Sequence, residues 1–156
     1  MAQADHRREQ RSASFETGTV GDVMSHGVIS CPPATPLRVV ARMMAIYRVH
    51  AIFVFEYAAQ DEAPQLWAVV SDLDLVAATR LDLDTLTAGA TAVTPLVTVA
   101  ADGSIGEAGS LMAQYGIAHL VVTESGSPRP VGVISTLDIA RAVAAGVGPR
   151  GTFASA

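Results

Sequence analysis

The feature that most constrains this fold is an internal repeat, in which a short apolar strand ends in Ser-x-x-Asp and leads directly into an apolar helix. Residues 67–78 read WAVVSDLDLVAA, and residues 130–142 read PVGVISTLDIARA. Because a repeat of about 60 residues cannot bury its own apolar faces well, we expect the two copies to pack together as a pseudo-twofold pair. The corresponding motif residues are Ser71 with Ser135 and Asp74 with Asp138.

Each copy predicts the same order of elements: strand, helix, strand, strand, helix. The two adjacent strands of each copy are almost continuously apolar, which indicates a sheet covered on both faces. The fold class is therefore α/β (α+β), built from two β-α-β-β-α units. The expected strands are 28–31, 51–55 and 66–70 in the first copy and 96–99, 119–123 and 131–134 in the second.

The first helix of each copy has a recognisable start and an apolar face. Thr35 is the expected N-cap with Pro36 at the first helical position, and residues 102–104 start the corresponding helix. Apolar residues then recur at helical spacing, which favours a face packed in the core. These residues are Leu37, Val40, Met44 and Tyr47 in the first copy and Ile105, Ala108, Met112 and Tyr115 in the second.

The domain organisation follows from the repeat. We expect the first repeat at 18–82 and the second at 83–146, with tails at 1–17 and 147–156 that lack periodicity. The loop between the paired strands is four residues longer in the first copy, as a surface connection can be.

Composition excludes several classes of function. The chain of 156 residues is half hydrophobic, yet no apolar run is long enough to cross a membrane and no secretory signal precedes the repeat, so we expect a soluble cytoplasmic protein. A net charge of −5, with no lysine and ten scattered arginines, argues against nucleic acid as a partner. One cysteine, Cys31, and four histidines without ligand spacing predict no disulfide and no metal site.

The duplicated order of elements, closed each time by an apolar strand and Ser-x-x-Asp, resembles the cystathionine-β-synthase (CBS) domain pair, or Bateman module, over roughly residues 17–146. The resemblance implies a regulatory or sensor module that binds an adenosine nucleotide (AMP, ADP or ATP) in a cleft between the repeats. It implies no required cofactor, a homodimer, and a protein target that these residues do not identify.

The resemblance also implies two clefts, each combining an aspartate from one repeat with residues of the other. In the cleft that fits best, Asp138 holds the ribose, and Gly132 leaves room for the base to approach the backbone. Its residues would be Thr19, Met24, Val49, Gly132, Val133, Ile134, Ser135 and Asp138. The weaker cleft has Ala68 where the other has Gly132, and its residues would be Val69, Ser71, Asp74, Thr87, Ala92 and Ile117.

Phosphate groups need cationic partners, and the candidates lie mainly in the cleft of Asp138, whereas the weaker cleft has Ala77 in place of Arg141, with Arg80 one turn on. His50 and His119 stand beside the strand starts, and Arg141 lies three residues after Asp138. Each has a simpler explanation, because a histidine at a strand start is often a structural hydrogen-bonding residue and Arg141 suits an exposed helix surface.

Other interpretations of the same residues stay open. Ser-x-x-Asp before an apolar helix is also a capping box, which needs no ligand. The module could therefore be a ligand-free structural or protein-interaction unit, or could bind S-adenosylmethionine. An enzyme is not expected, because Ser135, His119 and Asp138 lack any nucleophile-elbow or oxyanion-hole signature and two of them are explained by one helix start.

Overall fold

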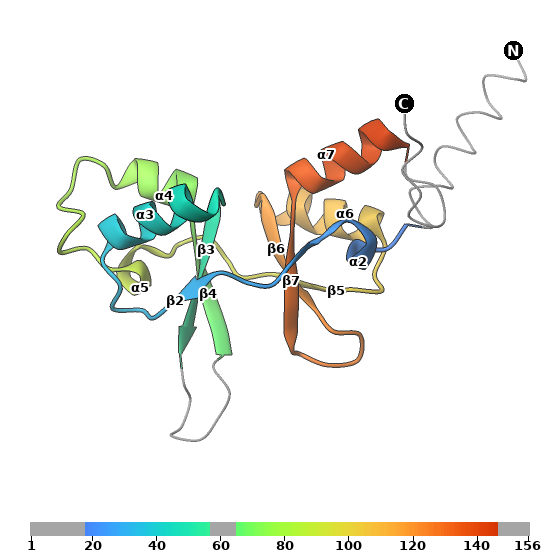
Figure 1. Cartoon of the computed structure of the whole chain (residues 1–156), viewed down its shortest axis with the longest axis horizontal. Coiled ribbons are helices and arrows are strands. Elements are labelled where there is room, and N and C mark those ends of the chain that lie inside the picture. Colours follow the sequence, from blue (N-terminus) through green and yellow to red (C-terminus); the bar gives the residue numbers. More distant parts are fainter. Residues whose placement is uncertain (1–17, 57–64, 147–156) are drawn as a thin grey trace, which may run out of the picture. The chain divides into compact units, whose positions relative to one another are not determined.

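The computed structural model describes residues 18–56 and 65–146, and these residues form two compact units (Figure 1). Unit 1 contains residues 18–27 and 97–146, and unit 2 contains residues 28–96 apart from the gap. The expected tails, and residues 57–64 of the longer loop, lie outside the described residues.

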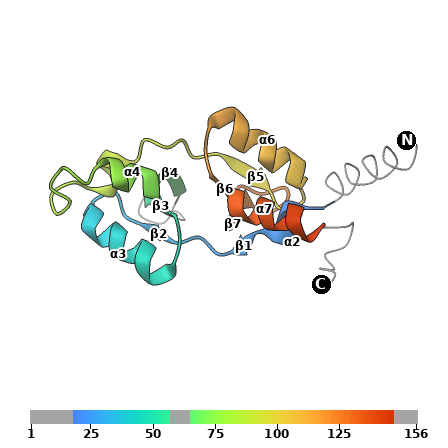
Figure 2. The ribbon, with the colours of Figure 1, turned by 90° about the horizontal axis from the view of Figure 1, so that it is seen from above.

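Unit 2 is a three-stranded sheet with helices over one face. Its strand order is β2-β3-β4, with β2 parallel to β3 and β3 antiparallel to β4. Figures 1 and 2 show α3 and α4 side by side on this sheet. The elements are β2 (Ser30–Cys31), α3 (Leu37–Tyr47), β3 (Ala51–Glu56), β4 (Gln65–Ser71), α4 (Asp72–Ala77) and α5 (Ala88–Thr91).

Unit 1 repeats this plan with one additional strand. Its sheet has the order β1-β7-β6-β5, in which β5 and β6 are parallel and the other pairs are antiparallel. The helices α6 and α7 pack against each other (Figure 2). The elements are α2 (Val20–Val23), β1 (Ser25–His26), β5 (Thr98–Ala100), α6 (Ile105–Tyr115), β6 (His119–Thr123), β7 (Pro130–Ser135) and α7 (Thr136–Ala145).

Each short helix packs with the other copy of the repeat. In unit 1, Thr19 pairs with Ser104, and the backbone N of Ile105 donates to the carbonyl of Gly18 at 3.1 Å. In unit 2, the equivalent contact joins residues 36–37 to residues 86–87. The compact units therefore differ from the sequence repeats. The boundary expected after residue 82 separates the two copies of the repeated sequence, whereas each compact unit contains segments of both copies.

The predicted order of elements is confirmed in both copies. The strand expected at 119–123 has those bounds, whereas the strand expected at 28–31 is reduced to Ser30–Cys31. Three elements were not predicted, namely α2, α5 and β1. They contain only two to four residues each, which is too short for a hydrophobic period to appear.

The apolar residues predicted to line one face of α3 and of α6 are buried in the core, except for the last residue of each set. Leu37, Val40 and Met44 are buried in unit 2, as are their counterparts on α6. Tyr47 and Tyr115, however, are 56% and 49% exposed, so their assignment to the core is wrong. Each tyrosine is the last helical residue before a left-handed C-cap, where the chain turns and leaves the ring uncovered.

The start of α3 also differs from the prediction. Pro36 is the N-cap in an extended conformation, Leu37 is the first helical residue, and no side chain caps the helix. The bridge from Pro36 to Thr87 holds this segment extended, so Thr35 lies one residue too early to cap. At α6 the expected start is confirmed, because Ser104 accepts a hydrogen bond from the backbone N of Glu107 at 3.0 Å.

The central strands are covered on both faces, as their composition predicted. Residues 51–54 of β3 and residues 120–122 of β6 are all buried. Among the helices described, none is both long enough and apolar enough to span a lipid bilayer.

Candidate functional site: the start of helix α7

Asp138 lies in the first turn of α7, where β7 passes into the helix. Its Oδ2 accepts hydrogen bonds from the backbone N of Ser135 at 2.8 Å and from Ser135 Oγ at 2.7 Å. Ser135 Oγ in turn accepts from the backbone N of Asp138 at 3.2 Å. The capping box is therefore present, and it holds the carboxylate in one orientation.

The other carboxylate oxygen of Asp138 is less engaged. Oδ1 makes no hydrogen bond with any described residue, and Arg141 Nη1 lies 3.8 Å from it. The side chain of Asp138 is 13% exposed, whereas that of Arg141 is 69% exposed. A carboxylate oriented by one oxygen can accept hydroxyl hydrogen bonds through the other, and the nearby guanidinium can attract an anionic group.

His119 and Val133 lie on the same sheet face as Ser135, the residue that caps α7. His119 is the cross-strand partner of Ser135, so the two side chains point to the same side of the sheet. Val133 lies two residues before Ser135 and also faces that side. Ile134 faces the opposite side and is fully buried in the core of unit 1, which corrects the expectation that its side chain lines a ligand.

Gly132 has a structural role that differs from the expected one. A Cβ at this position would lie 2.4 Å from the carbonyl oxygen of Ser25 and 2.8 Å from Met24 Sδ. The position that a Cβ would take at Gly132 is therefore filled by Ser25 of β1 and by Met24, another residue of the predicted cleft, and the approach of a base to Gly132 stays a prediction.

Thr19 is the N-cap of α2, and its backbone N donates to Asp22 Oδ2 at 3.1 Å.

Val49 and His50 belong to unit 2 and not to the unit that contains Asp138. Val49 packs against the core of unit 2. His50 is exposed, and its Nδ1 lies 2.9 Å from Asp72 Oδ2. One ring nitrogen of His50 is thus already bonded to a carboxylate, and its role as a phosphate ligand stays a prediction.

The corresponding carboxylate in unit 2, Asp74, has a larger set of donors. Its Oδ2 accepts from the backbone N of Ser71 at 2.8 Å, from Ser71 Oγ at 2.9 Å and from Thr94 Oγ1 at 2.8 Å. Sequence reasoning missed Thr94. The contact joins residues 20 positions apart, and no local spacing pattern indicates it.

The remaining residues of the weaker predicted cleft are structural in their own units. Thr87 is the N-cap of α5, with its side chain accepting from the backbone N of Ala90 at 3.4 Å, and Ala92 is the C-cap. Val69 is buried in unit 2. Ile117 belongs to unit 1 and is buried in its core.

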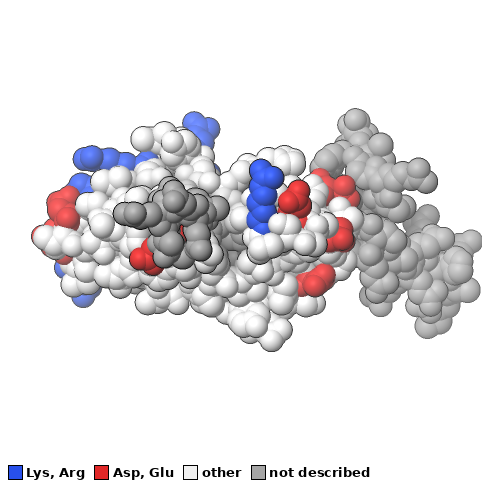
Figure 3. Space-filling view, turned by 90° about the horizontal axis from the view of Figure 1, so that it is seen from below, with Lys and Arg blue, Asp and Glu red and all other residues white. Residues whose placement is uncertain are grey.

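Within the part of the chain that the structure describes, no group of three His, Cys, Asp or Glu side chains is placed to hold a metal ion. Burial raises the pKa of the Cys31 thiol, and a hydrogen bond with Thr35 opposes this more weakly, so the thiol stays neutral in the core. On the face shown in Figure 3, the described surface is mostly uncharged, with basic and acidic side chains scattered over it.

The comparisons with known proteins agree with this fold. The family model of the CBS domain matches residues 20–80 and 90–145. No curated protein sequence matches the chain.

Among solved structures, the CBS domain protein PAE2072 from Pyrobaculum aerophilum, complexed with AMP, is 28% identical with a TM-score of 0.67, covering 81% of this chain and 98% of that one. Hypoxic response protein I, with two coordinated zinc ions, is also 28% identical with a TM-score of 0.62, covering 80% and 98%. The CBS-domain protein ATU1752 from Agrobacterium tumefaciens is 17% identical with a TM-score of 0.69, covering 81% and 93%, and shows the fold alone. The chain therefore belongs to the CBS domain family, of which it contains two copies.

Proposed function

We propose that the chain is a regulatory module that binds an adenosine nucleotide at the start of α7, with Asp138 accepting hydrogen bonds from the ribose hydroxyls. The observation that carries the proposal is the carboxylate of Asp138, which the capping box orients through Oδ2 while Oδ1 stays without a hydrogen bond from the described residues. The AMP complex of a protein that is 28% identical supports the choice of ligand class.

Arg141 and His119, both in unit 1, would serve the phosphate. Arg141 lies 3.8 Å from Asp138 Oδ1 with most of its side chain exposed, so it can move toward an anion without losing a buried contact. His119 lies across the strand pair from Ser135. Thr19, Met24 and Val133 complete the proposed set in unit 1, and Val49 and His50 stay predictions.

The expected affinity is modest. A nucleoside monophosphate has a little over 20 heavy atoms, and at roughly 0.3 kcal/mol per atom the Kd is on the order of 10 μM. A hydrogen bond to a charged group contributes about 1.5 to 3 kcal/mol, so removing the charge of Asp138 should weaken binding by about 10- to 150-fold.

Isothermal titration calorimetry with AMP, ADP, ATP and S-adenosylmethionine tests the proposal. Asp138→Asn keeps an acceptor for the capping box but removes the charge, so one of these ligands should bind the native chain and lose affinity for this variant. Asp74→Asn is the matched control, because it makes the same change at the corresponding helix start. No heat of binding for any of the four ligands, with the native chain folded, would refute the proposal.

The second candidate is an interaction module that binds no small ligand. Exposed apolar side chains on the helices favour it, including Leu73, at 73% exposure, and Leu137, at 50%. These positions correspond in the two copies, and they are also where we propose that a homodimer forms. Zinc is not proposed, since no three candidate ligand side chains gather among the described residues.

A further inference from the structure

The two oxygens of the Asp138 carboxylate have different neighbours. Oδ2 accepts from the backbone N and the hydroxyl of Ser135, which occupy it fully. Oδ1 lies 3.8 Å from Nη1 of Arg141, three residues further along α7. The oxygen that we propose for the ribose hydroxyls is therefore also the oxygen that pairs with a guanidinium in the ligand-free chain.

The exposure of the two side chains shows which of them can move. Asp138 is 13% exposed and is held through Oδ2, whereas the side chain of Arg141 is 69% exposed. An exposed ion pair within one helix turn changes an equilibrium constant by only about twofold. The guanidinium can therefore leave Oδ1 for a stronger partner at little cost, while the carboxylate stays in place.

A phosphate group is such a partner. Arginine can bind a phosphate through two parallel N–H···O hydrogen bonds, which are stronger than a single exposed ion pair. When the phosphate of a nucleotide takes the guanidinium, Oδ1 becomes free to accept from a ribose hydroxyl. A ligand without an anionic group offers nothing in exchange, so its hydroxyls must compete with Arg141 for Oδ1.

The corresponding helix start in unit 2 has the capping box without the arginine. Ser71 and Asp74 form the same reciprocal hydrogen bonds at the start of α4. Ala77 stands three residues after Asp74, where α7 has Arg141, and its methyl group can neither pair with a carboxylate nor bind a phosphate. The pairing of Oδ1 with an arginine is therefore a property of α7 and not of the Ser-x-x-Asp motif in general.

We infer that Arg141 makes binding at Asp138 depend on a 5′-phosphate, because it pairs with Oδ1 in the free chain and releases it when the phosphate binds. The chain therefore selects AMP over adenosine, and also over S-adenosylmethionine, whose 5′ substituent is a cationic sulfonium. This selection rests on the proposed function. The ion pair between Arg141 and Asp138 belongs to the ligand-free chain and can be measured separately.

Isothermal titration calorimetry with AMP and adenosine tests the selection, because these ligands differ only in the phosphate. The native chain should bind AMP about tenfold more tightly than adenosine. Arg141→Gln should weaken AMP binding by about tenfold and strengthen adenosine binding by about twofold, whereas a residue that only supports α7 would weaken both. Arg129→Gln, at the far end of β7 from Ser135, removes the same charge and should leave both affinities unchanged.

Three binding results would contradict the inference, and they differ in what they leave standing. Equal affinities of the native chain for AMP and adenosine, or an unchanged ratio in Arg141→Gln, would overturn the selection and leave the proposed function intact. Tighter binding of S-adenosylmethionine than of AMP would do the same. No binding of any of these ligands would overturn the proposed function and the selection with it.

A double-mutant cycle tests the ion pair without a ligand. Thermal unfolding is measured for the native chain, Arg141→Gln, Asp138→Asn and the variant with both substitutions. If the side chains interact, the shift in Tm of the double variant should be smaller than the sum of the two single shifts. Additive shifts would show that Arg141 does not hold Oδ1, and would overturn the inference even if AMP binds.

Discussion

At the scale of single residues, Gly132 shows how one side chain determines the pairing of two strands. Its backbone lies against Ser25 and Met24, in a space that the Cβ of any other residue would enter. The sequence marked Gly132 as unusual, and the neighbouring atoms belong to Ser25 of β1 and to Met24, the C-cap of α2.

Gly132→Ala should destabilise the chain by about 2 kcal/mol, because the new methyl group lies 2.4 Å from a backbone oxygen and forces β1 away from β7. Urea denaturation measures this change. Gly109→Ala is the matched control in α6, where the nearest atom to the new Cβ is Ile139 Cδ1 at 3.9 Å. The control should be neutral or stabilising by up to about 1 kcal/mol. Equal stabilities for the two variants would show that β1 moves at no cost.

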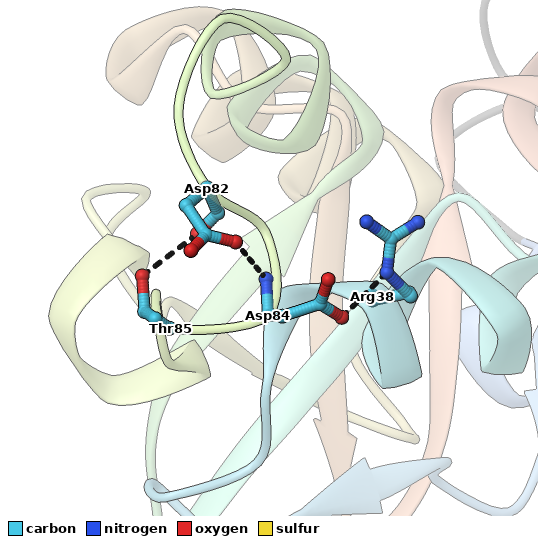
Figure 4. Close-up of polar contacts among 4 residues, drawn as sticks. All are labelled: Arg38, Asp82, Asp84 and Thr85. Carbon is cyan, nitrogen blue, oxygen red and sulfur yellow. Dashed lines mark hydrogen bonds and ion pairs between the residues drawn. The ribbon is translucent and has the colours of Figure 1, made fainter.

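At the scale of elements, an ion pair joins the loop after α4 to the first turn of α3. Figure 4 shows Arg38 Nε donating to Asp84 Oδ1, and Asp82 turning the loop through its contacts with Asp84 and Thr85. The backbone N of Arg38 also donates to the carbonyl of Leu83 at 3.0 Å. These contacts hold the loop that leads to α5, the short helix that the hydrophobic pattern did not reveal.

Asp84→Asn should reduce stability near neutral pH but not in acid. The hydrogen bond from Arg38 holds the pKa of Asp84 below its ordinary value. Its contribution is therefore present above the unfolded-state pKa of about 3.9 and is lost as pH falls through the lower folded-state pKa. Thermal unfolding of both chains at pH 7 and at pH 3 measures the difference.

The thermal unfolding of Asp84→Asn needs a control variant, because the substitution also changes the net charge of the chain. Asp102→Asn removes one negative charge at an exposed position that makes no hydrogen bond with the described residues. If Asp102→Asn showed the same pH-dependent loss as Asp84→Asn, net charge and not the ion pair with Arg38 would be responsible. Because the pair is exposed, added salt should also reduce the effect of Asp84→Asn.

At the scale of the whole molecule, exposed apolar side chains recur at corresponding positions of the two copies. Leu73 on α4 corresponds to Leu137 on α7, and Tyr47 on α3 corresponds to Tyr115 on α6; all four are exposed. A contiguous patch of exposed apolar side chains is typical of a surface that binds a partner, and we propose that these helices form one in a homodimer.

The chain should therefore be a homodimer at tens of micromolar, and Leu73→Glu combined with Leu137→Glu should make it monomeric, because four carboxylates would be introduced into an apolar interface. Sedimentation equilibrium measures the mass. Ser125→Glu, in the exposed turn after β6, is the control and should leave the dimer unchanged. A monomeric native chain would contradict the prediction.

The sequence alone determined the duplication, the order of the main elements and the two Ser-x-x-Asp helix starts. These features are local: the hydrogen bonds between Ser135 and Asp138 join residues three positions apart, and the apolar period of α3 or α6 lies within one segment. Local contacts of this kind form whenever the helix forms, so a short pattern predicts them.

Only the tertiary structure decided which neighbours surround each motif. Thr94 reaches Asp74, Ser25 fills the space at Gly132, and α2 and α5 each pack with the other copy. These contacts join residues far apart in the chain, and they depend on strand register and on single methyl groups that hydrophobic patterns do not encode. Two identical local motifs therefore have different surroundings, because the chain that returns beside each one pairs with it differently.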